Sequence, residues 1–457
     1  MSRLIIVSNR VASPNELNNS PAGGLATTLQ MALHKRQGIW FGWSGETNTE
    51  NNAVQSIKKN GVEYTLINLT KTQIDKYYSG FSNQLLWPLC HYRLDLIKYD
   101  LSEFNSYIEV NRLFANKLLP LLKEDDIIWV NDYHLILLAG ELRQLGCKNH
   151  IGFFLHIPFP CLDVFSAAPP YKQLLNGLCR YDLLGFQTTN DKDNFISCIT
   201  KENLATQIET NKYQMGAHIF KCGVFPATID SNRFYNLTKA EEKQKKWQHL
   251  INQLNDKCLI IGVDRLDYSK GITYRFKAFE LLLEQEKRFI ERIKFLQITP
   301  KSRSSVIDYQ NIQQKVAEQT GKINGKFSTI NWSPIGYINK NLQQSTLSLL
   351  YRQARVALVT PMRDGMNLVA KEYIASQDPD NPGVLILSKF AGAAEQLHNA
   401  IIINPYDPQE TVDALTKAIN MSREERIERW APMKRYLDEN PTEKWYNDFL
   451  NCLQQSE

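Results

Sequence analysis

Short apolar runs, each followed by ten or more residues of helix-like periodicity, recur along the whole chain. Continuous runs rich in β-branched residues are typical of strands that are buried on both faces of a parallel sheet. Their alternation with helices predicts a doubly wound α/β fold and excludes all-α and all-β architectures. The eight runs cover residues 4–7, 126–130, 151–155, 183–186, 258–263, 295–298, 356–359 and 384–387.

The chain divides at a charged stretch that has no strand signal. Residues 237–257 are rich in lysine, glutamate and glutamine, and the apolar runs restart at Cys258. A chain of 457 residues is also too long for one hydrophobic core. We therefore expect two doubly wound domains that face each other across a cleft, over residues 1–235 and 236–440. An aromatic-bearing terminal helix over 441–457 is expected to pack back on the first domain.

The composition excludes several classes of protein. With 43% apolar and 22% charged residues, the chain has enough material for packed cores, which excludes wholesale disorder. The net charge of +5 is small and dispersed, so we expect no nucleic-acid partner. The eight cysteines lack the spacing of zinc ligands, and no apolar run is long enough for a signal peptide or a membrane span. A cytoplasmic protein with reduced cysteines is expected.

Polar residues follow most of the apolar runs directly. In parallel sheets, ligands bind outside the carboxyl ends of the strands. A single charged residue at such a position is more often a solvated loop residue or a helix cap, but the recurrence favours a binding site. These strand-end residues are 8–10, 131–134, 156, 187, 264–265, 299–303 and 360–364.

The segment 264–271, which we call the clamp loop, carries the densest group of charges. Arg265 and Lys270 lie in a turn directly after an apolar run, where two cations can converge on a diphosphate. Each cation alone could instead form an ion pair with Asp264 or Asp267. The presence of further cations at other strand ends favours the diphosphate.

Two glycine-containing turns precede expected helices, at residues 22–24 and 364–367. Helix N-termini preceded by glycine favour phosphate or developing negative charge, although an ordinary helix start fits each turn equally well. Neither turn matches a P-loop or a GxGxxG fingerprint, so ATP hydrolysis and dinucleotide redox chemistry lose their usual support. A helix that starts near Asn367 places Glu372 in its second turn. There Glu372 could accept hydrogen bonds from a ribose, or cap the helix or pair with Lys371.

Taken together, these strings resemble the trehalose-6-phosphate synthase family of the bacterial type. The similarity extends over nearly the whole chain, and the strings RLDYSKG and RDGMNLVAKEY are its most specific parts. The strings are SNR (8–10), AGGL (22–25), WFGWSG (40–45), WPLCHYR (87–93), NDYH (131–134), FFLHIPFP (153–160), LLGFQT (183–188), VDRLDYSKG (263–271), QITPKSR (297–303), LVTPMRDGMNLVAKEY (358–373) and FAGAAEQL (390–397).

The resemblance implies a retaining glycosyltransferase of the GT-B architecture, with two Rossmann-like domains. The family moves glucose from UDP-glucose, or another nucleotide-glucose, to the anomeric hydroxyl of glucose 6-phosphate, giving α,α-trehalose 6-phosphate. The resemblance also implies front-face attack without a protein nucleophile, a metal or another cofactor. For the oligomeric state, both a monomer and a homo-oligomer are compatible with the sequence. Two alternatives remain, namely a relative that uses another sugar phosphate or a cyclitol phosphate as acceptor, and a non-catalytic regulatory relative.

The resemblance also implies roles for individual residues. The acceptor phosphate set would be Arg10, Tyr78, Trp87 and Arg303, and Asp132 would bind an acceptor hydroxyl. Arg265 and Lys270 would hold the donor diphosphate, and Glu372 the ribose. Gly23 and Gly24 would approach the phosphates. The transferred glucose and the nucleotide would contact His156, Asp364, Gly365, Met366, Asn367, Leu368 and Val369, and the candidates closest to the chemistry are His156, Arg265, Lys270 and Asp364.

One string departs from the family pattern. Where relatives usually read Pro-Ile-Gly-Ile, this chain reads Pro226-Ala227-Thr228-Ile229. A side chain at Thr228 occupies space that glycine leaves open. We predict a small change in hinge or acceptor-side geometry without loss of activity.

Overall fold

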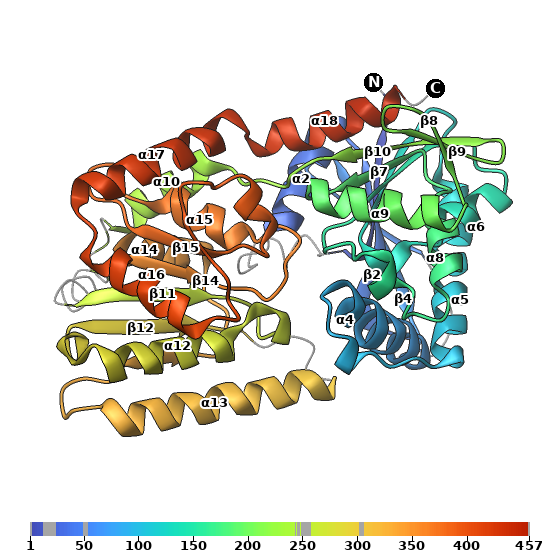
Figure 1. Cartoon of the computed structure of the whole chain (residues 1–457). Coiled ribbons are helices and arrows are strands. Elements are labelled where there is room, and N and C mark those ends of the chain that lie inside the picture. The colour runs from blue at the N-terminus through green and yellow to red at the C-terminus, as the bar shows by residue number, and fades with distance from the viewer. Residues whose placement is uncertain are drawn as a thin grey trace. The chain divides into compact units, whose positions relative to one another are not determined.

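The computed structural model describes residues 2–11, 24–48, 54–242, 244, 247, 257–300 and 306–455. The chain forms two compact units (Figure 1): the first contains residues 1–227 and 443–457, and the second contains residues 228–442. The predicted α/β fold with parallel sheets is confirmed, and all eight predicted runs form strands. Among the described helices, none combines the length and the apolar character needed to cross a bilayer.

The first unit is built on a ten-stranded sheet with the order β3-β4-β2-β1-β5-β6-β7-β10-β9-β8. Its seven central strands are parallel, whereas β3, β9 and β8 are antiparallel additions at the edges. Its strands are β1 (Leu4–Arg10), β2 (Ile39–Thr47), β3 (Gln55–Lys59), β4 (Val62–Leu69), β5 (Ile127–Asn131), β6 (His150–Phe154), β7 (Leu183–Phe186), β8 (Thr206–Glu209), β9 (Lys212–Met215) and β10 (His218–Val224).

Tight turns explain the antiparallel edges. The strands β3 and β4 are joined by Asn60 and Gly61, and both residues have positive φ angles, of 52° and 77°. Such a two-residue turn can connect only antiparallel neighbours, because its twist matches that of a hairpin. The helices of this unit are α2 (Gly24–Arg36), α3 (Lys71–Gln73), the π-helix η1 (Ile74–Leu86), α4 (Trp87–Cys90), α5 (Leu101–Leu118), α6 (Leu138–Gln144), α7 (Leu162–Phe165), α8 (Tyr171–Leu178) and α9 (Thr189–Lys201).

The second unit is built on a parallel six-stranded sheet with the Rossmann order β13-β12-β11-β14-β15-β16. Helices α12, α13 and α16 form one layer, and α10, α14, α15 and α17 form the other (Figure 1). The elements are α10 (Ser231–Glu242), β11 (Cys258–Val263), α12 (Ile272–Gln285), β12 (Ile293–Ile298), α13 (Ile307–Phe327), β13 (Ile335–Ile338), α14 (Gln344–Gln353), β14 (Val356–Val359), α15 (Leu368–Ser376), β15 (Val384–Ser388), β16 (Ile401–Ile403), α16 (Pro408–Asn420) and α17 (Arg423–Glu439).

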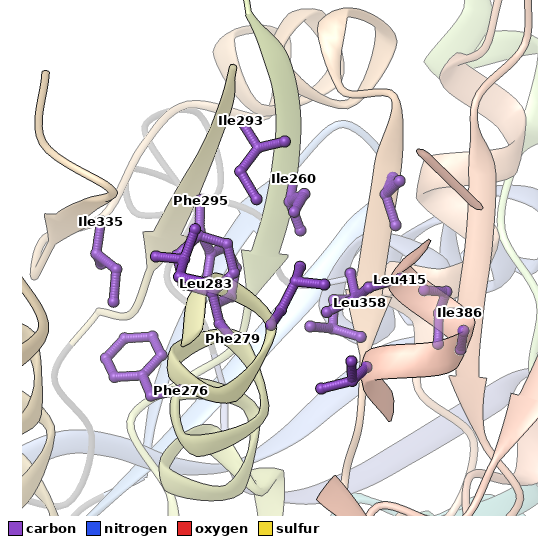
Figure 2. Close-up of a cluster of buried hydrophobic side chains, with 14 of the residues drawn as sticks. Ile260, Phe276, Phe279, Leu283, Ile293, Phe295, Ile335, Leu358, Ile386 and Leu415 are labelled. Carbon is purple, nitrogen blue, oxygen red and sulfur yellow. The ribbon is translucent and has the colours of Figure 1, made fainter. Parts of the chain in front are cut away.

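One apolar core layer of the second unit lies between its sheet and the helices that include α12. Figure 2 shows Phe295 of β12 and Leu358 of β14 beside Phe279 and Leu283 of α12. All four side chains are fully buried. The branched strand residues and the leucines and phenylalanines of the helix thus fill one apolar layer, which holds the amino end of α12 against the carboxyl ends of the strands.

The terminal helices pack through aromatic side chains. Trp430 of α17 donates a hydrogen bond to the carbonyl of Ile374 over 2.9 Å, within the second unit. In α18 (Thr442–Gln454), the ring of Phe449 stacks on Trp129 with 4.9 Å between centroids, within the first unit. Trp445 donates to the carbonyl of Phe225 over 2.9 Å.

The compact units divide after Ala227, whereas the sequence suggested a boundary near residue 235. Residue 235 falls inside α10 (Ser231–Glu242), which packs against α14 and α15 of the second unit. The packing face of α10 therefore assigns the whole helix to the second unit.

Candidate active site

The strand orders create a switch point in each sheet, where ligands bind in folds of this kind. In the first unit it lies between β1 and β5, and in the second between β11 and β14. Most of the predicted site residues follow these strands or their neighbours, whereas Tyr78 and Trp87 lie in η1 and α4. Arg303 and Gly23 lie outside the described residues, and Gly24 is the first residue of α2.

Two hydrogen bonds tie the π-helix η1 to the strand ends of the first unit. The hydroxyl of Tyr77 donates to Asn9 Oδ1 at the end of β1, over 2.9 Å. The hydroxyl of Tyr133, just after β5, donates to Asn83 Oδ1 over 2.9 Å. Because all four side chains are buried, these bonds set the distance between η1 and the switch point.

The predicted acceptor residues Tyr78 and Trp87 are held by stacked rings. Tyr78 stacks on His134 with 5.7 Å between centroids and 15° between planes. Trp87 stacks on His91 at 4.1 Å and 29°. Arg10 is exposed at the end of β1, and its guanidinium packs against the backbone of Gly45. The first unit therefore supplies two aromatic rings in fixed orientations and, at the end of β1, an exposed guanidinium.

His156 and Asp132 are joined through the backbone at the ends of β5 and β6. The amide of His156 donates to Asp132 Oδ1 over 3.3 Å, and Asp132 has a positive φ of 77°. The His156 ring lies with Nε2 3.0 Å from Asn131 Oδ1. Since the Asn131 amide nitrogen donates to the carbonyl of Trp129, Oδ1 is the accepting atom and His156 Nε2 is the donor.

Burial decides the charge of His156. It lowers the pKa of the imidazole to about 3, because the charged form would lose its hydration. The ring is therefore neutral at physiological pH, and with Nε2 protonated its Nδ1 is a hydrogen-bond acceptor. His156 can orient a sugar hydroxyl but cannot supply a positive charge.

The clamp loop of the second unit is shaped by Asp267 and Gly271. Asp267 accepts hydrogen bonds from the amide of Ser269 over 2.9 Å and from the hydroxyl of Tyr309 over 3.0 Å. Gly271 has a φ of 67°, and a Cβ atom there would lie 2.3 Å from the carbonyl oxygen of Thr360. The loop is thus held tightly against the end of β14 with Arg265 exposed.

Lys270 forms its ion pair with a residue distant in sequence. Its Nζ lies 2.5 Å from Asp364 Oδ2, and Asn367 Nδ2 donates to the same oxygen over 3.0 Å. The alternative partners expected from the sequence are engaged elsewhere: Asp264 pairs with Arg275, and Asp267 caps the turn. The pair brings together the clamp loop and the loop that follows β14.

The predicted helix start after residue 367 is confirmed, since α15 begins at Leu368 and Asn367 is its N-cap. Asn367 accepts from the amide of Ala370 over 3.3 Å. The preceding loop is fixed by backbone bonds, in which the amides of Asp364 and Ala393 donate to the carbonyls of Phe390 and Met366. The amino end of α15 is therefore a rigid site for negative charge.

Glu372 lies in the second turn of α15, as predicted, and is buried. It accepts a hydrogen bond from the hydroxyl of Tyr351 over 3.2 Å. Burial raises the pKa of Glu372 to about 7, and the bond from Tyr351 opposes that rise. Glu372 therefore changes charge near neutral pH.

Several residues that build the site were missed by sequence reasoning. Tyr77, Asn83 and Arg275 lie inside helices, where a polar residue is usually solvated. No periodicity in the sequence separates these three residues from solvated polar residues of a helix. No cluster of metal-ligating side chains is found in the described part of the chain.

Known proteins share this architecture over their full length. The family described as glycosyltransferase family 20 matches residues 2–455. The chain is 47% identical over 456 residues to a trehalose-6-phosphate synthase of Sinorhizobium fredii, which covers 99% of this chain and 98% of that protein. A solved E. coli structure bound with UDP-2-fluoro glucose is 45% identical, with a TM-score of 0.95 and 99% of each chain covered. A UDP-forming α,α-trehalose-phosphate synthase of Burkholderia xenovorans, in complex with glucose-6-phosphate, is 44% identical, with a TM-score of 0.95 over 99% of this chain and 100% of that chain.

Proposed function

The chain belongs to glycosyltransferase family 20, and we propose that it transfers glucose from UDP-glucose to glucose 6-phosphate, giving α,α-trehalose 6-phosphate and UDP. The bond between the donor anomeric carbon and the β-phosphate oxygen breaks. A bond from that carbon to the anomeric oxygen of the acceptor forms on the same face, and the acceptor proton passes to the leaving phosphate. The match to the family model and the 47% identity to a relative confirm the family that the sequence motifs predicted.

The observation that carries the proposal is the full-length similarity to relatives named for this reaction. One of the similar structures holds a UDP-sugar analogue, and another holds glucose-6-phosphate. A second support is chemical: one unit offers cations and a helix start to a diphosphate, while the other offers rings and hydrogen-bonding groups to a sugar.

In the proposed donor site, Arg265 and Lys270 bind the diphosphate. The ion pair with Asp364 holds the ammonium group of Lys270 in one position. This supports a binding site that is already organised before the diphosphate arrives. Asp364 and the backbone from Gly365 to Val369 contact the transferred glucose and the nucleotide. Glu372 accepts hydrogen bonds from the ribose, and Gly23 and Gly24 approach the phosphates.

In the proposed acceptor site, Arg10, Tyr78, Trp87 and Arg303 bind the phosphate of glucose 6-phosphate. Asp132 accepts a hydrogen bond from an acceptor hydroxyl. His156 holds a hydroxyl of the donor glucose as a neutral imidazole, which its lowered pKa supports. The stacked supports under Tyr78 and Trp87 favour a fixed orientation of their polar atoms.

The proposed reaction requires no metal or other cofactor. The charge that develops on the leaving UDP is stabilised by Arg265, Lys270 and the amino end of α15. Full activity is expected in the presence of a chelator such as EDTA. Loss of activity that magnesium restores would refute this part of the proposal.

The test of the proposed function is incubation of the purified protein with UDP-glucose and glucose 6-phosphate, with the product identified by mass and by NMR. Failure to form the disaccharide phosphate with UDP-, ADP- or GDP-glucose would refute it. Parallel reactions with a cyclitol phosphate detect the alternative acceptor. Binding of UDP without turnover of any acceptor would indicate a regulatory relative.

A cytoplasmic location is part of the same proposal. All eight cysteines lie in the described part of the chain, and none forms a disulfide. Reduced thiols are typical of a reducing compartment. Fractionation of cells that produce the protein would test this location.

A further inference from the structure

Arg275 is a buried arginine next to the clamp loop. It lies in the first turn of α12, and its side chain is 0% exposed. A guanidinium cannot lose its charge in a protein, so its burial is tolerated only where acceptors replace the lost water. The identity of those acceptors therefore shows what the residue holds in place.

The acceptors of Arg275 come from three neighbouring strand ends. Its Nη1 donates to Asp264 Oδ2 after β11 over 2.7 Å and to Gln297 Oε1 of β12 over 2.9 Å. Its Nε donates to Thr360 Oγ1 after β14 over 3.0 Å. One side chain thus joins β12, β11 and β14, which are adjacent in the sheet and include the switch point.

Two contacts of Arg275 are with the clamp loop itself. Asp264 directly precedes Arg265, and Arg275 Nη2 also donates to the backbone carbonyl of Lys270 over 3.4 Å. Burial raises the pKa of Asp264, and the charges of Arg275 and Lys270 oppose that rise. Without Arg275, the buried carboxyl group of Asp264 would lose its ion-pair partner at the base of the loop.

Gly262 makes room for this arrangement. A Cβ atom at this position in β11 would lie 2.4 Å from Arg275 Nη1 and 2.5 Å from Gln297 Oε1. The guanidinium therefore lies directly over the backbone of the strand. This glycine interrupts the apolar run at residues 258–263 for a reason of local packing.

We infer that Arg275 is a positioning residue for the donor site, because it fixes both ends of the clamp loop from which Arg265 and Lys270 extend. It acts through the loop and does not itself contact the donor. The inference rests on the proposed function for its substrate, but it concerns a residue outside the predicted site. Gly262 is its structural counterpart in the strand.

The experiment compares Arg275→Met, Arg275→Lys and Gly262→Ala with two matched controls. Arg426→Met removes another buried arginine of the same unit, whose bonds go to Pro382 and Asn381. Gly336→Ala adds a methyl group to a neighbouring strand, where the nearest atom is 3.3 Å away. Calorimetry with UDP and steady-state kinetics for each substrate are measured beside the melting temperature.

We expect Arg275→Met to weaken UDP binding and raise the KM for UDP-glucose by about tenfold or more, while the KM for glucose 6-phosphate changes less than about twofold. Arg275→Lys is expected to recover part of the loss, and Gly262→Ala to reproduce it in a smaller degree. Arg426→Met is expected to lower the melting temperature without changing UDP binding.

Wild-type UDP binding by Arg275→Met, or equal changes in the KM of both substrates, would overturn the inference. If Arg275→Met does not fold, the same test is applied to Arg275→Lys and Gly262→Ala. Wild-type UDP binding by both, or equal changes in the KM of both substrates, would then overturn the inference. The wild-type reaction is measured separately. If UDP binding depends on Arg275 but the wild-type protein makes no disaccharide phosphate, only the proposed function is refuted.

Discussion

The strand-end residues of the first unit are oriented by rings and amides, whereas those of the second are oriented by ion pairs. Tyr78 stacks on His134 in the first unit, and Lys270 pairs with Asp364 in the second. Aromatic and amide side chains offer directional hydrogen bonds without adding net charge, and such bonds suit the hydroxyl groups of a sugar. An anionic partner keeps a cationic side chain ordered before a diphosphate arrives, so less reorganisation is needed on binding.

The largest expected effect comes from removing a cation of the second unit. Lys270→Met is expected to lower kcat/KM by about 10²- to 10³-fold, because the charge on the leaving UDP loses one stabilising group. Steady-state kinetics with UDP-glucose measure it. Lys326→Met, which removes an exposed lysine of α13 that pairs with Glu280 and Glu284, is the control. A loss of less than tenfold in Lys270→Met would contradict the role assigned to the clamp loop.

A smaller effect is expected from the first unit. Trp87→Phe keeps an aromatic ring against His91 but removes an N–H donor proposed for the acceptor phosphate. The KM for glucose 6-phosphate is expected to rise by about thirtyfold, which corresponds to about 2 kcal/mol for a hydrogen bond to a charged group. UDP binding by calorimetry is expected to stay unchanged.

The matched control for Trp87 is Trp129→Phe. Trp129 is a buried tryptophan of the same unit, and its Nε1 has no hydrogen-bond partner within the described residues. This change is expected to leave both KM values within about twofold of wild type. Equal effects of the two substitutions would mean that ring packing, and not the N–H group, carries the role of Trp87.

Glu372 is expected to cause a pH effect on the donor side. The pKa of Glu372 is about 7, so the carboxyl group loses accepting capacity as the pH falls from about 8 to about 6. If only the ionised form binds the ribose, the KM for UDP-glucose rises by up to about tenfold over this range. Kinetics at several pH values measure it, and the profile of Glu372→Gln serves as the reference, because the phosphate of glucose 6-phosphate itself titrates at about pH 6.

Protonation of Glu372 stabilises the second unit, so the pH effect on stability has the opposite sign to the effect on binding. The pKa of Glu372 in the folded protein, about 7, lies above the ordinary value of 4.5. Its contribution to the free energy of unfolding is therefore full below pH 4.5 and is lost as the pH rises toward 7. Glu372→Gln is expected to flatten both profiles. Burial also lowers the pKa of Lys371 to about 7, so Lys371 titrates in the same pH range and contributes to the pH dependence left in that variant. An unchanged profile would refute the role of Glu372.

The smallest effect is expected at Thr228, where the second unit begins. Thr228→Gly is expected to change the KM for glucose 6-phosphate by about twofold, and unchanged kinetics for both substrates would contradict the prediction.

Thr228 is buried, and its hydroxyl has no partner within the described part of the chain. Thr228→Val is therefore expected to raise the free energy of unfolding by about 1 kcal/mol, measured by urea denaturation.

Eight strands with continuous apolar sequence were predicted, whereas the edge strands and the inner strands β2, β4 and β10 were not. The run at residues 258–263 forms β11 as expected, because burial on both faces leaves no polar position in it. The edge strand β13 (Ile335–Ile338) has three partly exposed residues, one of which is a glycine, so it lacks that pattern. Edge strands need fewer apolar residues and therefore leave a weaker signal.

The positions of candidate site residues were predictable where those residues lie close in sequence to an apolar run. Arg265, Lys270 and Asp364 were expected because each follows an apolar run within a few residues. Arg275 was not, because an arginine inside a helix has the same sequence appearance whether it is solvated or buried. Its role depends on Gly262, Gln297 and Thr360, which no periodicity connects to it.

The sequence by itself determined the alternation of strands and helices, the polar character of the strand ends and the membership of the family. These depend on the order of residue types along the chain. Only the tertiary structure decided that Lys270 pairs with Asp364 and that Arg275 reaches Thr360, across 94 and 85 residues. Such pairs form because the sheet places β14 beside β11, and hydrogen bonds require a closeness in space that distance along the chain does not reveal.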